Sequence, residues 1–159
     1  MRTKGEPAMN CPLPAIYLKP EWAGRIALIA KSHELLLGHR LVETGDDVIT
    51  ALWSSSCAIV AHGTQADPVF FFGNAAALAV FETDAEAFIG MPSRLSAEPP
   101  LRGERQALLD RVAAKGFIDD YAGIRISAKG RRFHIGPATV WNLVDEAGLR
   151  HGQAACFVP

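Results

Sequence analysis

The chain has 159 residues, 49% of them hydrophobic and 21% charged, which suits one soluble globular domain with a substantial core. The formal net charge is -1, from 16 Lys plus Arg against 17 Asp plus Glu, and this balance argues against direct nucleic-acid binding, which a basic face and a high pI would indicate. The three cysteines are widely spaced and form no Cys-x-x-Cys pair, which argues against a disulfide framework or a structural zinc site.

The sequence shows no pattern for export or membrane insertion. Its N-terminal residues lack the apolar core of a signal peptide, and no stretch approaches the roughly 20 apolar residues needed to cross a bilayer. We therefore expect a cytoplasmic protein that does not associate with a membrane.

The N-terminal part is predicted to be an arm followed by a long helix. Residues 1–19 contain several prolines and few packing residues, so we expect an irregular arm without a function of its own. Apolar residues then recur at helical spacing, which predicts an amphipathic helix over residues 20–45 that ends at Gly45 and opens a single domain, 20–159. Its apolar stripe either covers the sheet of its own chain or mediates homodimerisation. A second short helix is expected over residues 46–53.

The centre of the chain is predicted to be a hairpin followed by short helices. Residues 57–61 and 69–72 are short apolar runs that predict two strands joined by a loop. In that loop, His62 is either a hydrogen-bonded loop residue or a ligand contact. Asn74 follows the second strand and is expected to cap a helix, and Asp84 can cap another.

The remaining elements are one helix and three strands. Residues 91–100 contain three prolines and predict a constrained loop, and residues 101–115 predict an amphipathic helix. Residues 117–127, 131–144 and 149–158 predict strands. The order of elements indicates an α+β fold, in which a five-stranded antiparallel sheet carries short helices on one face and an N-terminal amphipathic helix.

Several strings in this chain resemble a known family. They are AHGTQADP at 61–68, GMPSR at 90–94, AEP at 97–99, GFIDDY at 116–121 and GQAA at 152–155. In this order they resemble the MEKHLA family, a PAS-like group, and the likeness covers roughly residues 20 to 158. The resemblance implies a PAS-like fold and strand order, a sensory or binding role, and homodimerisation through the leading helix.

The resemblance also implies a ligand cavity between the sheet and the helices that cross it. The candidate apolar lining residues are Ile59, Phe70, Phe72, Phe88, Leu108, Ile124, Phe133 and Trp141, and the candidate polar anchors are Asn74, Arg94, Arg132 and Gln153. Each apolar candidate is equally what a plain core requires. Arg94 either clamps a carboxylate or phosphate of a ligand or pairs with an acidic side chain of the protein. In the strand 117–127, alternation assigns Ile124 to one face and Arg125 to the other.

The residue types argue against the cofactors known from PAS domains. A haem commonly needs a histidine on the long helix, and residues 101–115 contain none. Flavin photochemistry of the light-sensing kind needs a cysteine near the short helices, and residues 74–100 contain none. The histidines also lack metal-ligand spacing with carboxylates, so we expect neither a cofactor nor a metal.

The leading hypothesis is a stand-alone sensory or binding module for a small apolar or amphipathic ligand, a protein partner, or both. The same domain follows DNA-binding and zipper segments in plant homeodomain leucine-zipper regulators, and because this chain shows neither, we expect its output to pass through another protein. One alternative is a small enzyme that uses Asp120 and His134 for acid-base chemistry. Another is a structural dimerisation module with a filled core.

Overall fold

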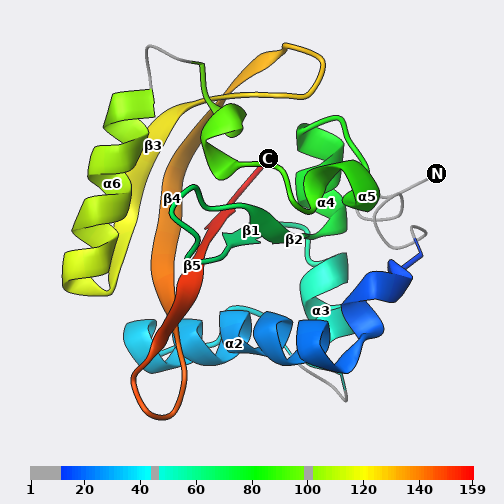
Figure 1. Ribbon diagram of the computed structural model, residues 1–159, viewed down its shortest axis with the longest axis vertical. Helices are drawn as coiled ribbons and strands as arrows, with labels where there is room; N and C mark the ends of the chain where they lie inside the picture. The colour runs from blue at the N-terminus through cyan, green and yellow to red at the C-terminus, as the bar shows by residue number, and fades with distance from the viewer. Residues whose placement is uncertain (1–11, 44–46, 99–101) are drawn as a thin grey trace.

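All five strands of the central sheet run antiparallel to their neighbours, in the order β2-β1-β5-β4-β3. They are β1 (Ala58–His62), β2 (Phe70–Gly73), β3 (Phe117–Ile126), β4 (Arg132–Val144) and β5 (Arg150–Phe157). The structure is a computed structural model that describes residues 12–43, 47–98 and 102–159 (Figure 1). Each strand overlaps the segment that the sequence predicts for it.

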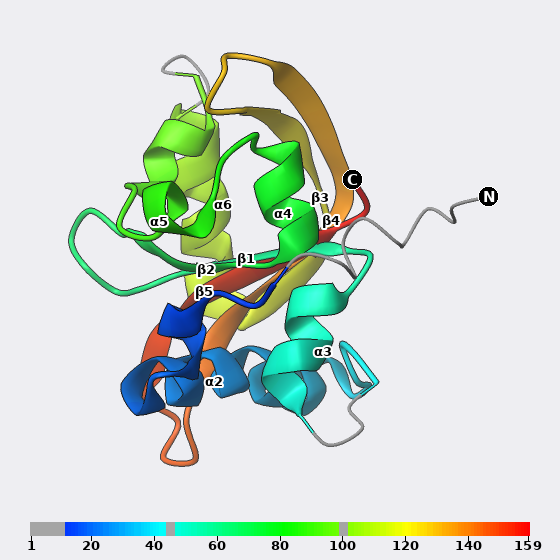
Figure 2. The same cartoon turned by 90° about the vertical axis from the view of Figure 1, so that its right-hand side faces the viewer.

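Helices cover both faces of this sheet. In chain order they are the 3-10 helix η1 (Ala15–Leu18), α2 (Pro20–Leu37), α3 (Val48–Ser54), α4 (Ala75–Val80), α5 (Ala85–Phe88), the 3-10 helix η2 (Ser93–Ser96) and α6 (Arg102–Lys115). Figure 2 shows α4, α5 and α6 on one side of the sheet and α2 and α3 on the other. The predicted α+β architecture is confirmed, including short helices on one face and a leading helix elsewhere.

Asn74 fixes the turn from β2 into α4. Its side-chain oxygen accepts hydrogen bonds from the backbone N–H of Ala77 at 3.0 Å and of Ile59 at 2.9 Å. Its side-chain nitrogen donates to the carbonyls of Leu52 at 2.9 Å and Cys57 at 2.8 Å. The predicted helix cap is confirmed, and the same amide also ties α3 and β1 to α4.

The leading helix α2 is shorter than the sequence predicts. It ends at Leu37, and Gly38 follows in the left-handed conformation with φ 83° while its N–H donates to the carbonyl of Glu34. The predicted end at Gly45 is therefore wrong, because Gly38 already terminates the helix; Gly45 itself lies outside the described residues.

The apolar stripe of α2 packs on the sheet of its own chain. Ile26 and Ile29 are fully buried, and the indole N–H of Trp141 in β4 donates to the carbonyl of Ile29 at 3.1 Å. The hydroxyl of Ser32 donates to the carbonyl of Val144 at 3.2 Å and accepts from its N–H at 2.9 Å. Of the two readings left open by the sequence, these contacts match the intramolecular one, and a dimer would have to use other surfaces of α2.

Residues 12–19, which precede α2, pack against the sheet through one aromatic side chain. Tyr17 in η1 is fully buried, and its hydroxyl donates to the carbonyl of Gly73 at 2.9 Å and accepts from the N–H of the same residue at 3.1 Å. The prediction of an irregular arm is therefore wrong for Ala15–Leu18, which form η1 and are anchored to β2 by one aromatic side chain, whereas residues 12–14 have no regular secondary structure. Residues 1–11 lie outside the described part of the chain.

Candidate functional site

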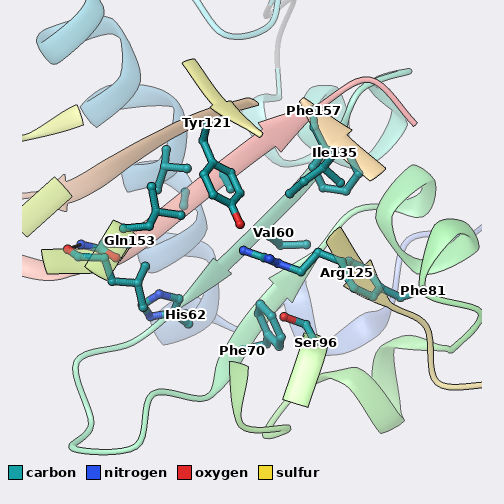
Figure 3. Close-up of a pocket in the computed structure, with 15 residues that line it drawn as sticks. Val60, His62, Phe70, Phe81, Ser96, Tyr121, Arg125, Ile135, Gln153 and Phe157 are labelled. Atoms are coloured by element: carbon teal, nitrogen blue, oxygen red, sulfur yellow. Dashed lines mark hydrogen bonds between the residues drawn. The ribbon is translucent and has the colours of Figure 1, made fainter. Parts of the chain in front are cut away.

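A cavity lies between the inner face of the sheet and the helices η2 and α6 (Figure 3). Its volume is about 60 Å³, several times the roughly 10 to 15 Å³ that one water requires. It is lined by Val60, His62, Phe70, Phe81, Ser96, Leu108, Leu109, Tyr121, Arg125, Ile135, Val140, Gln153, Ala154, Ala155 and Phe157. Most of these side chains are apolar and none is a carboxylic acid, so the few polar groups define its chemistry.

Gln153 in β5 supplies a fixed polar group to this cavity. Its side-chain nitrogen donates to the carbonyl of Leu109 at 3.2 Å and to the side-chain oxygen of Asn142 at 3.1 Å. That Asn142 oxygen also accepts from Arg150, and the Asn142 nitrogen donates to the carbonyl of Val112. Because a flipped Gln153 would set its oxygen against two acceptors, the network fixes its orientation.

This orientation leaves the other end of the Gln153 amide unsatisfied. The Gln153 Oε1 atom is buried and accepts no hydrogen bond from any residue that the structure describes. A buried acceptor without a donor is rare in folded proteins, since leaving it unpaired costs about 1 to 3 kcal/mol. The described residues therefore leave this atom able to accept one more hydrogen bond.

His62 lies beside Gln153 because β1 pairs with β5 in register. The two residues are directly opposite each other, and the His62 Nδ1 atom lies 2.9 Å from the carbonyl oxygen of Gly63. In Figure 3 both side chains lie at the same end of the cavity. His62 is thus both a hydrogen-bonded residue and part of the cavity wall.

Arg125 in β3 contributes the positive charge of the cavity. Its side chain is only 9% exposed, its Nη1 atom donates to the carbonyl of Ile124 at 3.1 Å, and its Cζ atom lies 5.2 Å from the centre of the Tyr121 ring. In Figure 3 the guanidinium points into the middle of the cavity, toward the Tyr121 hydroxyl. This is an unusual position for an arginine, because buried charges are normally paired.

Three of the twelve candidate ligand residues named from the sequence line this cavity. They are Phe70, Leu108 and Gln153. Two others support its walls from behind, because Phe88 stacks on Phe70 at 4.2 Å between ring centres and Phe133 contacts Phe81 at 5.2 Å.

A β-bulge separates Phe70 from Phe72, which the sequence analysis placed together in the cavity. In the register of β1 with β2, Ala61 is opposite Phe72 but His62 is opposite Phe70. Phe71, between them, is therefore an extra residue without a partner in β1, and the side chains on either side of it point to opposite faces of the sheet. Phe72 packs against Tyr17 at 4.9 Å on the opposite side of the sheet.

A second bulge turns Arg125 inward and Ile124 outward. Ile118 is opposite Val140 and Tyr121 is opposite Ala138, so β3 has three steps where β4 has two. One extra residue reverses the alternation, so Tyr121 and Arg125 line the cavity while Ile124 lies on the other face. The sequence-based assignment of Ile124 to the cavity is wrong for this reason.

The remaining apolar or amide candidates have structural positions. Ile59, adjacent to Val60 in β1, is fully buried outside the cavity wall. Trp141 packs beneath α2, where its indole contacts the His33 ring at 4.8 Å between centres. Asn74 is the cap described above. Ile59 and Trp141 were predicted to line the cavity, and the structure gives them other positions; of the two roles considered for Asn74, polar anchor and helix cap, the structure shows the cap.

The two predicted arginine anchors face solvent. Arg94 forms an exposed ion pair with Asp67 at 3.1 Å, which is the pairing with an acidic side chain that the sequence left open. Arg132 pairs with Glu98, and the hydrogen bond from the guanidinium lowers the pKa of that carboxyl. Neither arginine lines the cavity, so neither can hold a ligand there.

The residues of the enzyme alternative do not meet. His134 is opposite Ile124 in the register of β3 with β4. Asp120 lies four residues away along β3, which is about 13 Å in an extended strand. A base and its orienting partner must be within hydrogen-bond reach of one another, so this pair does not form an acid-base site.

Within residues 12–43, 47–98 and 102–159, no three His, Cys, Asp or Glu side chains gather in a way that could hold a metal ion. In the same residues no helix has both the length and the apolar character needed to span a membrane.

Sequence comparisons identify relatives of this chain. A family model described as MEKHLA domain matches residues 23–159. The homeobox-leucine zipper protein ATHB-14 of Arabidopsis thaliana is 27% identical over 159 residues, which are 96% of this chain and 19% of that protein. The homeobox-leucine zipper protein ATHB-9 of the same plant is 31% identical over 116 residues, 72% of this chain and 14% of that protein. The chain thus spans less than a fifth of these relatives.

Comparison with solved structures shows the fold. The light-state dimer of the fungal blue-light photoreceptor Vivid matches with a TM-score of 0.58 and 16% identity, over 94% of this chain and 99% of that chain. A PAS domain from Colwellia psychrerythraea matches with a TM-score of 0.57 and 16% identity, over 67% of this chain and 88% of that chain. Since both identities are low, the likeness extends to the fold and not to the ligand.

Proposed function

Because the chain belongs to the MEKHLA domain family and has the fold of PAS and light-oxygen-voltage domains, we propose that it is a regulatory sensing module that binds a small ligand between the sheet and α6. The family resemblance carried by its sequence strings is thereby confirmed. The specific ligand and the partner that reads the bound state are part of the proposal.

The observation that carries this proposal is the unsatisfied Gln153 Oε1 atom in a mostly apolar cavity. A core without a ligand function would more simply place an apolar side chain at this position in β5. A ligand that donates one hydrogen bond to Gln153 and buries apolar surface against the walls would satisfy both features. At about 60 Å³ the cavity is much smaller than the roughly 300 to 1,000 Å³ of drug-sized pockets, so we expect a small ligand.

The strands β4 and β5 connect the cavity on one face of the sheet with α2 on the other. On β4 and β5, Val140 and Gln153 line the cavity, while Trp141 faces α2 and donates to the Ile29 carbonyl. A ligand that changes the packing of these strands therefore acts on the helix behind them. Such a switch requires that the ligand bind one packing of α2 more tightly than the other. Equal hydrogen-exchange rates in residues 20–37 with and without ligand would rule it out.

We further propose that the outer surface of α2 binds a protein partner, with a second copy of this chain as the first candidate. A groove between α2 and the β4–β5 turn is lined by Leu28 and Leu35 together with Val144 and Ala147, and Leu35 is 70% exposed. The solved structure of Vivid named above is a dimer, which supports this choice. Sedimentation of the wild type and of Leu35→Glu tests it: a wild-type monomer would refute the homodimer.

Native mass spectrometry of the freshly purified protein tests the ligand. Ala155 lines the cavity, so Ala155→Val is expected to reduce its volume and remove any co-purified mass. Ala122 is exposed on β3 outside the cavity, so Ala122→Val is the matched control and should retain that mass. Bare wild-type protein, or extra mass that Ala155→Val retains, would contradict a ligand in this cavity.

We propose that neither haem nor flavin is this ligand, for the reasons of residue type given above. The expected result is a visible absorption spectrum without a cofactor band in protein purified under mild conditions. A bound flavin or haem band would overturn this part of the proposal while leaving the sensing role intact.

A further inference from the structure

The charge of Arg125 has no counter-charge among the residues that the structure describes. A guanidinium has five N–H donors, and the interactions of this one are a hydrogen bond to the Ile124 carbonyl and the contact with the Tyr121 ring. Neither partner carries a negative charge. Within the part of the chain that the structure describes, no Asp or Glu side chain lines the cavity that the guanidinium enters.

Three exposed arginines of the same chain have acidic partners. Arg94 pairs with Asp67, Arg131 pairs with Glu82, and Arg132 pairs with Glu98, although solvent already screens each of these charges. Burial makes a counter-charge far more valuable, because an unpaired ion loses its hydration without compensation. Three exposed arginines thus have an acidic partner, whereas the buried Arg125 has none among the described residues. This pattern is what a binding site for an anion would produce.

The neighbouring hydroxyl is placed to take part. Tyr121 Oη makes no hydrogen bond to another described residue, and in Figure 3 it points toward the Arg125 guanidinium. Gly123 makes this position possible, because a Cβ atom there would lie only 2.3 Å from Tyr121 Oη. A guanidinium fork and a phenol hydroxyl offer three donors to one acceptor group.

We propose that the ligand of this cavity is a small carboxylic acid with a mostly apolar body that carries one hydroxyl group, that its carboxylate binds Arg125 and Tyr121, and that its hydroxyl donates to Gln153 Oε1. The planar guanidinium matches a carboxylate in a two-pronged geometry. A phosphate group would bring nearly two negative charges into a cavity with one cation and a volume of about 60 Å³. The apolar body lies against Phe70, Ile135 and Val140 of the wall. This inference rests on the proposed ligand-binding function and names its chemical class.

Isothermal titration calorimetry with matched probes tests the proposal. The probes are straight-chain carboxylates of two to six carbons that carry a terminal hydroxyl group, and the primary amides of the same hydroxy acids. The wild type is expected to bind the best acid at least about 10-fold more tightly than its amide, because hydrogen bonds to a charged group are the stronger ones. Affinity for the acids should rise with chain length until the apolar wall is filled.

Three variants test whether Arg125 causes the preference for acids over amides. Arg125→Met should weaken binding of the acids by roughly 10- to 100-fold and leave the amides nearly unchanged. Arg125→Lys keeps the positive charge but loses the planar guanidinium, so its affinity for the acids should lie between those of the wild type and Arg125→Met. Arg94→Met removes an exposed arginine outside the cavity and should bind like the wild type. Circular dichroism establishes that each variant is folded, and the comparison of acids with amides on the wild type needs no variant.

The outcomes separate this inference from the function on which it rests. If the wild type binds amides as tightly as acids, or if Arg125→Met keeps full affinity for acids, the proposal that the ligand binds Arg125 through a carboxylate is refuted. The cavity then remains a ligand site. If the wild type binds neither series, the inference is also overturned, and native mass spectrometry with Ala155→Val then decides separately whether any ligand occupies the cavity.

Discussion

Replacement of Asn74 by alanine should destabilise the protein strongly. The side chain is fully buried and makes four hydrogen bonds, two as acceptor and two as donor, which join α3, β1 and α4. Each bond contributes about 1 kcal/mol net, and removal leaves four buried backbone groups unpaired, so we expect a loss of about 4 kcal/mol. Domains of this size are stable by only about 5 to 15 kcal/mol, so such a loss is large.

Urea unfolding followed by tryptophan fluorescence and far-UV circular dichroism measures this change. Asn74→Asp keeps the two acceptor bonds but sets a carboxylate against the carbonyls of Leu52 and Cys57, so it should lose at least about 2 kcal/mol. Asp84→Ala is the matched control, because its side chain makes one exposed cap bond to Ala87 at 2.8 Å and should cost about 1 kcal/mol. A loss below about 1 kcal/mol for Asn74→Ala would refute the reasoning.

Three further predictions concern two titratable side chains with shifted pKa values and one glycine in close contact with the backbone. Burial lowers the pKa of His33 below 6.5, so the neutral imidazole contributes fully to stability above pH 6.5, and this contribution is lost as the pH falls through the lower folded-state pKa. Urea unfolding at several pH values should show the free energy of unfolding decrease over this range, and the decrease should be smaller in His33→Gln. Burial raises the pKa of the Cys156 thiol to about 11, so alkylation at pH 8 should be roughly 100-fold slower than in the unfolded chain, and equal rates would contradict this. Gly152→Ala should destabilise by about 2 to 4 kcal/mol, because its Cβ would lie 2.0 Å from the His62 carbonyl oxygen at a φ of 149°; unchanged thermal unfolding would contradict that contact.

The elements of this fold could be predicted because each has a local cause in the sequence. A short polar residue after an apolar run explains the turn at Asn74, and Gly116 ends α6 with φ 95° as the pattern indicates. The structure of Ala15–Leu18 could not be predicted, because it has no such local cause. Tyr17 is one aromatic residue among prolines, and its burial depends on the backbone of Gly73, far away in the sequence. Long-range packing of a single side chain leaves no periodic signal.

The lining of the cavity could be predicted only in part, since it depends on register. Alternation of side chains along a strand tells which residues share a face only while the strand has no extra residue. Gln153 and Leu108 lie in regular segments and were found from the sequence. Phe72 and Ile124 each follow a bulge, and nothing in their local sequence marks the extra residue.

Both bulges act on the same cavity, and this gives them a common explanation. A bulge interrupts a hydrogen-bonded ladder and is commonly kept where it redirects a side chain. The bulge in β2 turns Phe70 toward the cavity, and the bulge in β3 exchanges Ile124 for Arg125 on the inner face. A fold selected for stability alone would keep the isoleucine inside, because a buried arginine without an acid opposes folding. Departures from the local rules are expected where binding requires them, so the reversal of β3 is itself an argument that Arg125 serves a ligand.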